Sequence, residues 1–234
     1  MNATSRQKML IKAGGIAALL AGILFRRNIG AEIDLFSAND IPVGAAEWFL
    51  LLQDKPLLGL SFLAIFDLLN SLLVGLMFAG LGMVLWQKYT KAVTAALAVY
   101  LAGIIFGFAA NKALPMFSLS RQYAATSSAQ QAALEAAGEA LLARGGASGA
   151  YQGSLMTLSL FLIASAGLVF AILMLYSVNF NKAAAIFGFL ASGLDLLYCA
   201  TVLFVPTLAV AFIAAAGLCY MVWHILTGLR LLRL

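Results

Sequence analysis

Long runs of hydrophobic residues dominate the chain, and short polar segments separate them. A helix needs about 20 predominantly apolar residues to cross a hydrocarbon core of roughly 30 Å. Runs of this kind predict six membrane-spanning helices, over residues 9–25, 56–86, 92–110, 153–176, 183–204 and 207–229. Because these runs account for most of the chain, the pattern predicts an all-α, polytopic transmembrane bundle that forms one domain over residues 1–234.

The first run is the shortest, and its start is also typical of a signal peptide. Arg6 and Lys8 precede a brief apolar segment, as they would in such a peptide. Arg26 and Arg27 follow the run directly, however, and no small-x-small cleavage site is obvious. We therefore expect an uncleaved span rather than a signal peptide.

Two connections between the runs predict further helices. Apolar residues in the first connection recur at i, i+3, i+4 and i+7, namely Ala45, Trp48, Phe49 and Leu52. This spacing indicates a helix with one apolar face, which we expect to lie in the membrane interface with Trp48 at the level of the headgroups. In the second connection, the capping-box spacing of Ser127 and Gln130 predicts a soluble helix over residues 128–144.

The composition agrees with a chain that is embedded mostly in a lipid bilayer. Hydrophobic residues make up 64% of the chain and charged residues 10%, whereas soluble domains contain about 25% charged residues. The formal net charge is +5, but the basic residues stand in ones and twos at the ends of apolar runs. Such residues act as topology signals and surface anchors, so we expect the lipid bilayer as a partner and no nucleic acid.

The distribution of basic residues predicts an orientation. With six spans, 8 basic residues lie on the side of the N-terminus and 6 on the other side. The eight are Arg6, Lys8, Lys12, Lys88, Lys91, Lys182, Arg230 and Arg233, and no acidic residue accompanies them. Because cytoplasmic loops carry the excess of Lys and Arg, we expect a multi-pass protein of the bacterial inner membrane with both termini in the cytoplasm.

Small residues repeat every four positions in three of the spans. The repeats are Gly14, Ala18 and Gly22, then Gly103 and Gly107, then Gly188 and Ser192. Lipid gives no hydrophobic drive between spans, so faces of small residues are expected to form the helix contacts. These contacts either assemble the bundle within one chain or hold a homo-oligomer or another membrane protein.

A family resemblance rests on the segment Leu119–Leu142, which reads LSRQYAATSSAQQAALEAAGEALL. Together with Glu47-Trp48-Phe49 and Tyr151-Gln152-Gly153, this segment resembles the bacterial domain-of-unknown-function family numbered 4386. The resemblance covers nearly the whole chain, including the span count and the long connection between the third and fourth spans. It implies an uncharacterised six-span membrane protein, and it supplies no catalytic residue because no enzymatic motif defines that family.

Two carboxylates, Asp67 and Asp195, stand inside apolar runs at positions that predict a depth near the bilayer midplane. A charge there costs at least about 2.5 to 3.5 kcal/mol, so each should face the bundle interior and be either protonated or paired. Asn70 shares a helix face with Asp67, and Tyr198 shares one with Asp195. Two interpretations stay open, a centre that binds a ligand or relays a proton and a buried hydrogen bond that fixes packing.

The single histidine, His224, lies toward the predicted cytoplasmic end of the last span. A proton-relay or ligand contact and a satisfied histidine at the interface are both open interpretations. One histidine cannot form a metal site without partners, and the two cysteines, Cys199 and Cys219, lie inside apolar runs. We therefore expect neither a metal nor another cofactor.

These observations lead to two functional hypotheses. The first is binding or transport of a small amphiphile or cation at a midplane site, which requires Asp67 and Asp195 to face one cavity. The second is an accessory or structural subunit that packs against a larger membrane protein complex. Enzymatic activity is disfavoured because the chain lacks clustered His, Asp, Ser or Cys with the spacing of known catalytic sites.

Overall fold

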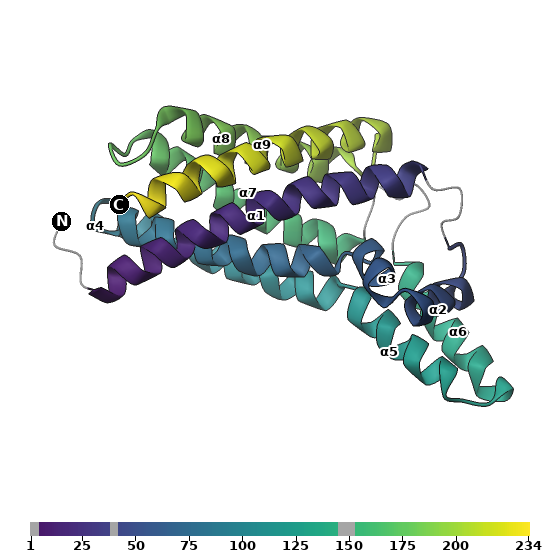
Figure 1. The fold of residues 1–234 in the computed structure, drawn as a ribbon. Helices are drawn as coiled ribbons and strands as arrows, with labels where there is room; N and C mark the ends of the chain where they lie inside the picture. Colours follow the sequence, from purple (N-terminus) through teal and green to yellow (C-terminus); the bar gives the residue numbers. More distant parts are fainter. Residues whose placement is uncertain (1–4, 38–41, 145–152) are drawn as a thin grey trace.

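The computed structural model describes residues 5–37, 42–144 and 153–234, and the regular elements in these ranges are all helices (Figure 1). They are α1 (Ser5–Ser37), α2 (Ala45–Asp54), α3 (Pro56–Phe62), α4 (Ile65–Ala110), α5 (Ala113–Ala124), α6 (Ser128–Leu142), α7 (Ser154–Leu175), α8 (Lys182–Thr201) and α9 (Pro206–Leu232). Five helical segments are long and apolar enough to cross a membrane: Ser5–Leu24, Ile65–Ala124, Ser154–Leu175, Lys182–Thr201 and Pro206–Leu232. The prediction of an all-helical fold is confirmed for the described residues, and these five segments are compatible with a membrane protein.

Helix α4 folds back on itself at Tyr89, whose φ of −131° and ψ of 35° are not helical. The Tyr100 hydroxyl donates a hydrogen bond to the Ser71 carbonyl. A Cβ atom placed on Gly82 would lie 3.2 Å from Cγ1 of Val93. Eleven residues of straight helix would separate those two positions by roughly 16 Å, so the two halves of α4 are antiparallel neighbours.

A turn divides the second apolar run into two helices. Residues 56–62 form the separate helix α3, and Ala64 then adopts a left-handed conformation with φ 64° and ψ 34°. The Asn111 side-chain amide donates to the Ala64 carbonyl at 3.1 Å, which holds this turn in place. The predicted continuous helix from residue 56 is therefore two helices, and the one long enough to cross a membrane begins at Ile65, because the run stays apolar through a turn that sequence hydropathy cannot detect.

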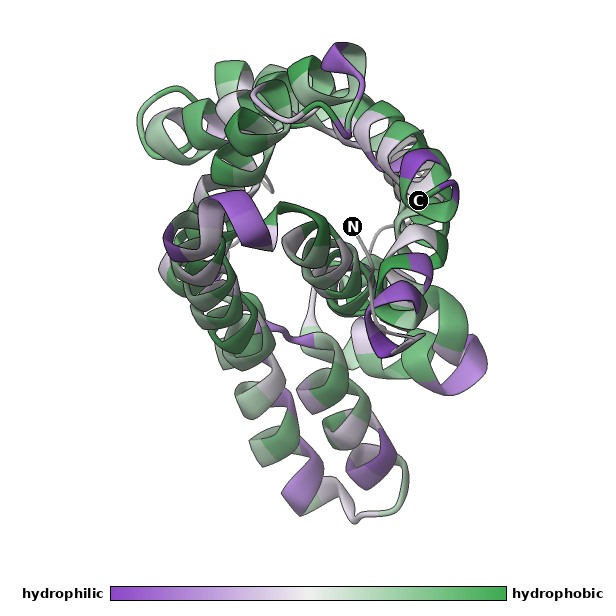
Figure 2. Ribbon diagram, turned by 90° about the vertical axis from the view of Figure 1, so that its left-hand side faces the viewer, coloured by the Kyte–Doolittle hydropathy of each residue, from purple (hydrophilic) through white to green (hydrophobic). Residues whose placement is uncertain are grey.

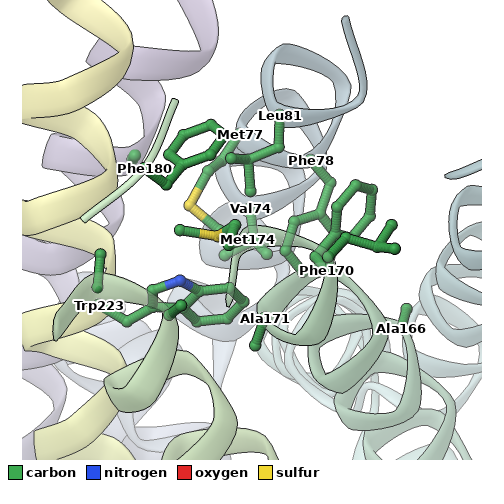
Figure 3. Close-up of a cluster of buried hydrophobic side chains, with 14 of the residues drawn as sticks. Val74, Met77, Phe78, Leu81, Ala166, Phe170, Ala171, Met174, Phe180 and Trp223 are labelled. Carbon is green, nitrogen blue, oxygen red and sulfur yellow. The ribbon is translucent and has the colours of Figure 1, made fainter. Parts of the chain in front are cut away.

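The long helices form a closed ring of contacts, viewed from one end in Figure 2. Helix α1 packs on α4 and α9, α4 packs on α7, α7 on α8, and α8 on α9. Side chains fill the interior (Figure 3). The ring centroid of Phe78 lies 4.5 Å from that of Phe170 and 6.0 Å from that of Trp223. An aromatic core thus joins α4, α7 and α9.

Small residues make the closest contacts between the helices, as predicted for the first and third apolar runs. A Cβ atom on Gly14 of α1 would lie 2.8 Å from the carbonyl oxygen of Leu76 in α4. A Cβ atom on Gly103 would lie 3.1 Å from the Ser159 carbonyl oxygen in α7, and the Ser159 hydroxyl donates to the Gly103 carbonyl at 2.7 Å. These faces pack within one chain.

Helices α2, α3, α5 and α6 lie together at one end of the bundle (Figure 1), and we call them the end layer. The buried residues of α2 are the four that the spacing predicted: Ala45, Trp48, Phe49 and Leu52. They pack in a cluster with Ala113 and Met116 of α5. The predicted helix and its apolar face are confirmed, but protein covers this face, and Trp48 is only 8% exposed.

The end layer contains one helix that the sequence pattern did not predict. Helix α6 agrees with the prediction for residues 128–144, although the Ser127 side chain makes no capping hydrogen bond. Helix α5 precedes it, and the Asn111 side-chain oxygen accepts a hydrogen bond from the Ala113 N–H at 2.9 Å at its start. The pair α5 and α6 supplies the surface against which α2 packs.

Candidate functional site

A buried carboxylate lies between α8 and α9. Asp195 belongs to the second half of α8 and is 6% exposed. The Tyr220 hydroxyl of α9 donates a hydrogen bond to its Oδ2 atom at 3.2 Å. Both residues stand well inside segments that are long and apolar enough to span a membrane. The two helices therefore share a polar contact inside the bundle.

The Asp195 partner belongs to a row of buried side chains on α9. Tyr220, Trp223, His224 and Thr227 follow one another at i, i+3, i+4 and i+7, so they share one helix face. Ring centroids lie 5.7 Å apart for Tyr220 and His224 and 5.6 Å apart for Trp223 and His224. We call Asp195, Tyr220, Trp223 and His224 the α8–α9 polar centre.

Glycines of neighbouring helices allow this centre to pack closely. A Cβ atom on Gly188 of α8 would lie 2.5 Å from Cε2 of Trp223, so the indole ring rests directly on the helix backbone. A Cβ atom on Gly167 of α7 would lie 2.7 Å from the Ser192 hydroxyl. The predicted small-residue face of Gly188 and Ser192 is therefore an internal packing surface.

Two polar atoms, one in the centre and one beside it, have no hydrogen-bond partner among the described residues. They are the indole Nε1 of Trp223, labelled in Figure 3 among the core side chains, and the hydroxyl of Thr227. A buried polar group without a partner costs about 1 to 3 kcal/mol. The centre thus has hydrogen-bonding capacity that neighbouring side chains do not use.

Asp67 and Asn70 do not join this centre by any described contact. Asp67 is exposed in the first turn of α4, where a carboxylate interacts favourably with the positive end of the helix dipole. The expectation that Asp67 faces the bundle interior is wrong, because its helix begins at Ile65 and its side chain is exposed. Asn70 lies less than one turn further on and is half-buried.

The pockets of the structure do not support a cavity that joins Asp67 to Asp195. The pocket between α5 and α6 and the pocket at the end of α9 include neither Asp67 nor Asp195. Asp195 is enclosed between α8 and α9, whereas Asp67 is on the surface. Asp195 therefore has to be considered as a site on its own.

Tyr198 and His224 are both buried but in different surroundings. Tyr198 packs with Val202 and with Ala209 of α9 in a small cluster of its own. His224 is 1% exposed, and a Cβ atom on Gly22 of α1 would lie 3.6 Å from its Cβ atom. Helix α1 therefore covers this turn of α9, and both interpretations of His224 stay predictions.

Sequence reasoning did not identify Tyr220 as the hydrogen-bond partner of Asp195, nor Trp223 as its neighbour on α9. Their spacing with His224 was visible in the sequence as one helix face. The pattern could not predict which helix packs against that face. The spans are apolar on every side, so many pairings of helices agree equally well with the hydropathy.

The described residues contain no group of three or more His, Cys, Asp or Glu side chains that could hold a metal ion. No family model matches the chain, and neither a curated protein nor a solved structure matches it. The resemblance to the family numbered 4386 thus stays a prediction from the sequence.

Proposed function

We propose that the protein is a multi-pass membrane protein that binds or conducts a small cation, including a proton, at the α8–α9 polar centre. The observation that carries this proposal is the burial of Asp195 against the neutral hydroxyl of Tyr220. A carboxylate inside a span costs at least about 2.5 to 3.5 kcal/mol when it is charged. It therefore takes up a proton or pairs with a cation.

The local sequence favours a cation from outside the chain. Within α8 the basic residue is Lys182 at its start, and in α9 the nearest Arg is Arg230 in its last turn. Both are too far along their helices to pair with Asp195, which lies 13 residues, or about 20 Å of helix, beyond Lys182. The close packing of Trp223 on Gly188 favours a compact cation over an amphiphile.

The proposal includes six crossings, since the two antiparallel halves of α4 count as two. An even number of crossings brings both termini to one side, and the start of α1 lies against the end of α9, where a Cβ atom on Gly15 would lie 3.0 Å from Leu232 Cγ. The excess of basic residues at this end supports cytoplasmic termini in a bacterial inner membrane. On this topology, the end layer lies on the opposite side, with α2 near the interface and α6 in water.

The test compares Asp195→Asn with Asp67→Asn in purified full-length protein reconstituted into liposomes. Rapid jumps in proton, Na⁺ or K⁺ concentration are applied while charge movement is recorded on a solid-supported membrane. Asparagine keeps the size of the side chain and an acceptor for Tyr220 but removes the negative charge. We expect Asp195→Asn to abolish the transient current and Asp67→Asn to retain it.

Other outcomes contradict the proposal. If the Asp195→Asn variant keeps the current of the wild type, or if no cation produces a current in the wild type, Asp195 serves packing alone. Loss of the current in both variants would instead support the earlier hypothesis of one site formed by Asp67 and Asp195. Thermal unfolding of each variant in detergent separates loss of binding from loss of fold.

A second candidate function is an accessory subunit of a larger membrane complex. It is favoured by an open groove of about 490 Å³ between α5 and α6, which Pro115, Leu119 and Leu141 line together with Arg144. Mild solubilisation of native membranes, followed by native gel electrophoresis, tests this function. Migration as a single small protein would contradict it, and migration in a stable larger assembly would support it.

A further inference from the structure

A second groove lies at the end of the bundle where α1 begins and α9 ends; Figure 1 shows these two helix ends on the same side of the bundle. Its volume is about 380 Å³, and it runs between the α7–α8 connection and the last turns of α9. The lining combines apolar and cationic side chains: Val178, Phe180, Leu226, Leu229, Arg230 and Arg233. Hydrophilic residues gather around the C-terminus at this end in Figure 2, beside hydrophobic helix surfaces.

Hydrogen bonds hold the walls of this groove in place. The Nε atom of Arg230 donates to the Asn179 carbonyl, which ties the end of α9 to the α7–α8 connection. Outside the groove, the Lys88 ammonium donates to the Tyr176 carbonyl at 3.4 Å, which ties α4 to the start of the same connection. The bond from Arg230 uses one of the five N–H donors of the guanidinium group and fixes its position. The groove is therefore preformed rather than assembled by its ligand.

The charge of the groove selects an anion. Arg230 and Arg233 are three residues apart near the end of α9, on one side of the helix. All eight basic residues assigned to this end of the bundle lack an acidic neighbour on the same side. A phosphate group matches the guanidinium donors in geometry and charge.

The apolar part of the lining selects a lipid over a free anion. Val178 is 97% exposed and Leu229 is 42% exposed, and both lie beside the arginines. A free phosphate would gain nothing from these side chains, whereas an acyl chain would cover them. Basic pockets between spans on the cytoplasmic side are also the places where anionic headgroups bind.

We propose that this groove binds an anionic phospholipid of the cytoplasmic leaflet, with the phosphate on Arg230 and Arg233 and an acyl chain along Leu226 and Leu229. The proposal rests on the topology given above, which places this end at the cytoplasmic surface, and it is independent of cation binding at Asp195. Each cation near a membrane surface strengthens anionic-lipid binding by about fivefold. The pair should therefore contribute roughly thirtyfold.

The test is native mass spectrometry of the full-length protein, titrated in detergent with phosphatidylglycerol, with phosphatidylcholine or with inorganic phosphate. We expect one phosphatidylglycerol to be retained by the wild type, and neither phosphatidylcholine nor phosphate to be retained comparably. The double variant Arg230→Gln/Arg233→Gln should bind phosphatidylglycerol roughly thirtyfold more weakly.

The matched control is Arg6→Gln/Lys8→Gln, which removes two exposed cations from the same end but outside the groove. It should bind phosphatidylglycerol as the wild type does. Equal weakening by both double variants would show diffuse attraction to a basic surface and overturn the proposal. Retention of phosphate alone would overturn it as well.

Loss of the Arg230 hydrogen bond could disturb the groove by itself, so Arg233→Gln serves as a second variant. Arg233 is exposed beyond the last helical turn. Its loss should weaken phosphatidylglycerol binding about fivefold without a change in thermal stability. Unchanged binding in this variant would contradict the assignment of the headgroup to the two arginines.

Discussion

Close contacts of single glycines determine how the α8–α9 polar centre is packed. The Trp223 indole rests on the backbone of α8 at Gly188, where any side chain would occupy the space of the ring. Interiors packed at this density tolerate added atoms poorly. In a membrane, where spans gain no hydrophobic free energy from their association, such contacts supply most of the affinity between helices.

Gly188→Ala tests this contact with one added methyl group. Its Cβ atom would lie 2.5 Å from Cε2 of Trp223, so the two helices have to separate. Overpacking of this kind costs about 1 to 3 kcal/mol. We expect a lower free energy of unfolding, measured by denaturant titration in mixed micelles.

Gly193→Ala is the matched control because the same change in the same helix meets no atom within 4 Å. There the gain in helix propensity, about 1 kcal/mol, should leave the protein as stable as the wild type or more stable. Equal stability of the two variants would show that the Trp223 contact does not limit the approach of α9 to α8.

The sequence could identify the acid of the α8–α9 polar centre but not its partner. Asp195 was identifiable because a carboxylate in an apolar run is costly. Its partner was not, since Tyr220 comes from another helix and hydropathy does not pair helices. Asp67 satisfied the same sequence criterion, yet it lies at a helix start, because the left-handed turn at Ala64 leaves no trace in hydropathy.

At the scale of elements, the end layer is held by a carboxylate from a distant part of the chain. The Ala45 N–H at the start of α2 donates to Oε1 of Glu139 in α6 at 2.6 Å. The Val43 N–H donates to Oε2 of Glu47 at 2.8 Å. A helix start has N–H groups without partners in its own helix, and carboxylates satisfy them and interact favourably with the helix dipole. Glu139 thus fixes how α2 docks on α6.

Glu139→Ala should loosen this docking. Loss of a capping acceptor costs about 0.5 to 2 kcal/mol. We expect faster amide hydrogen exchange in the first turn of α2, measured by mass spectrometry on the intact protein.

Glu135→Ala gives the comparison, since that carboxylate accepts from the Tyr123 hydroxyl at 2.6 Å and does not touch α2. Exchange in α2 should stay as in the wild type. If Glu139→Ala also left α2 unchanged, the capping role of Glu139 would be refuted.

Local periodicity could predict α2 and α6, but not how they assemble. The four apolar residues of α2 were identified correctly, whereas their cover was expected to be lipid. The reason is that α5 was missed, although Asn111 provides a capping side chain two residues before its start. An apolar face predicts burial, and the partner that buries it has to come from tertiary structure.

At the scale of the whole molecule, the two ends of the bundle differ in chemistry. One end holds the start of α1, the end of α9 with its arginines, Lys88, Lys91 and Lys182, and the other carries the end layer with its carboxylates. Both Lys88 and Arg230 donate to carbonyls of the same α7–α8 connection. The fold-back at Tyr89 therefore lies at the same end as the C-terminus. This arrangement requires an even number of crossings between Tyr89 and Arg230.

Single cysteines at Lys91, Arg233 and Ser128, which are all exposed, test this arrangement in oriented membrane vesicles. A maleimide that cannot cross the membrane should label Lys91→Cys and Arg233→Cys from the same, cytoplasmic, side and Ser128→Cys from the opposite side. The native Cys199 and Cys219 lie within the spans and should remain unlabelled, so the wild type gives the background. Labelling of Lys91→Cys and Arg233→Cys from opposite sides would contradict an even number of membrane crossings between Tyr89 and Arg230. The arginine groove and the fold-back at Tyr89 would then face different leaflets, and the lipid site would lose the cytoplasmic setting on which it depends.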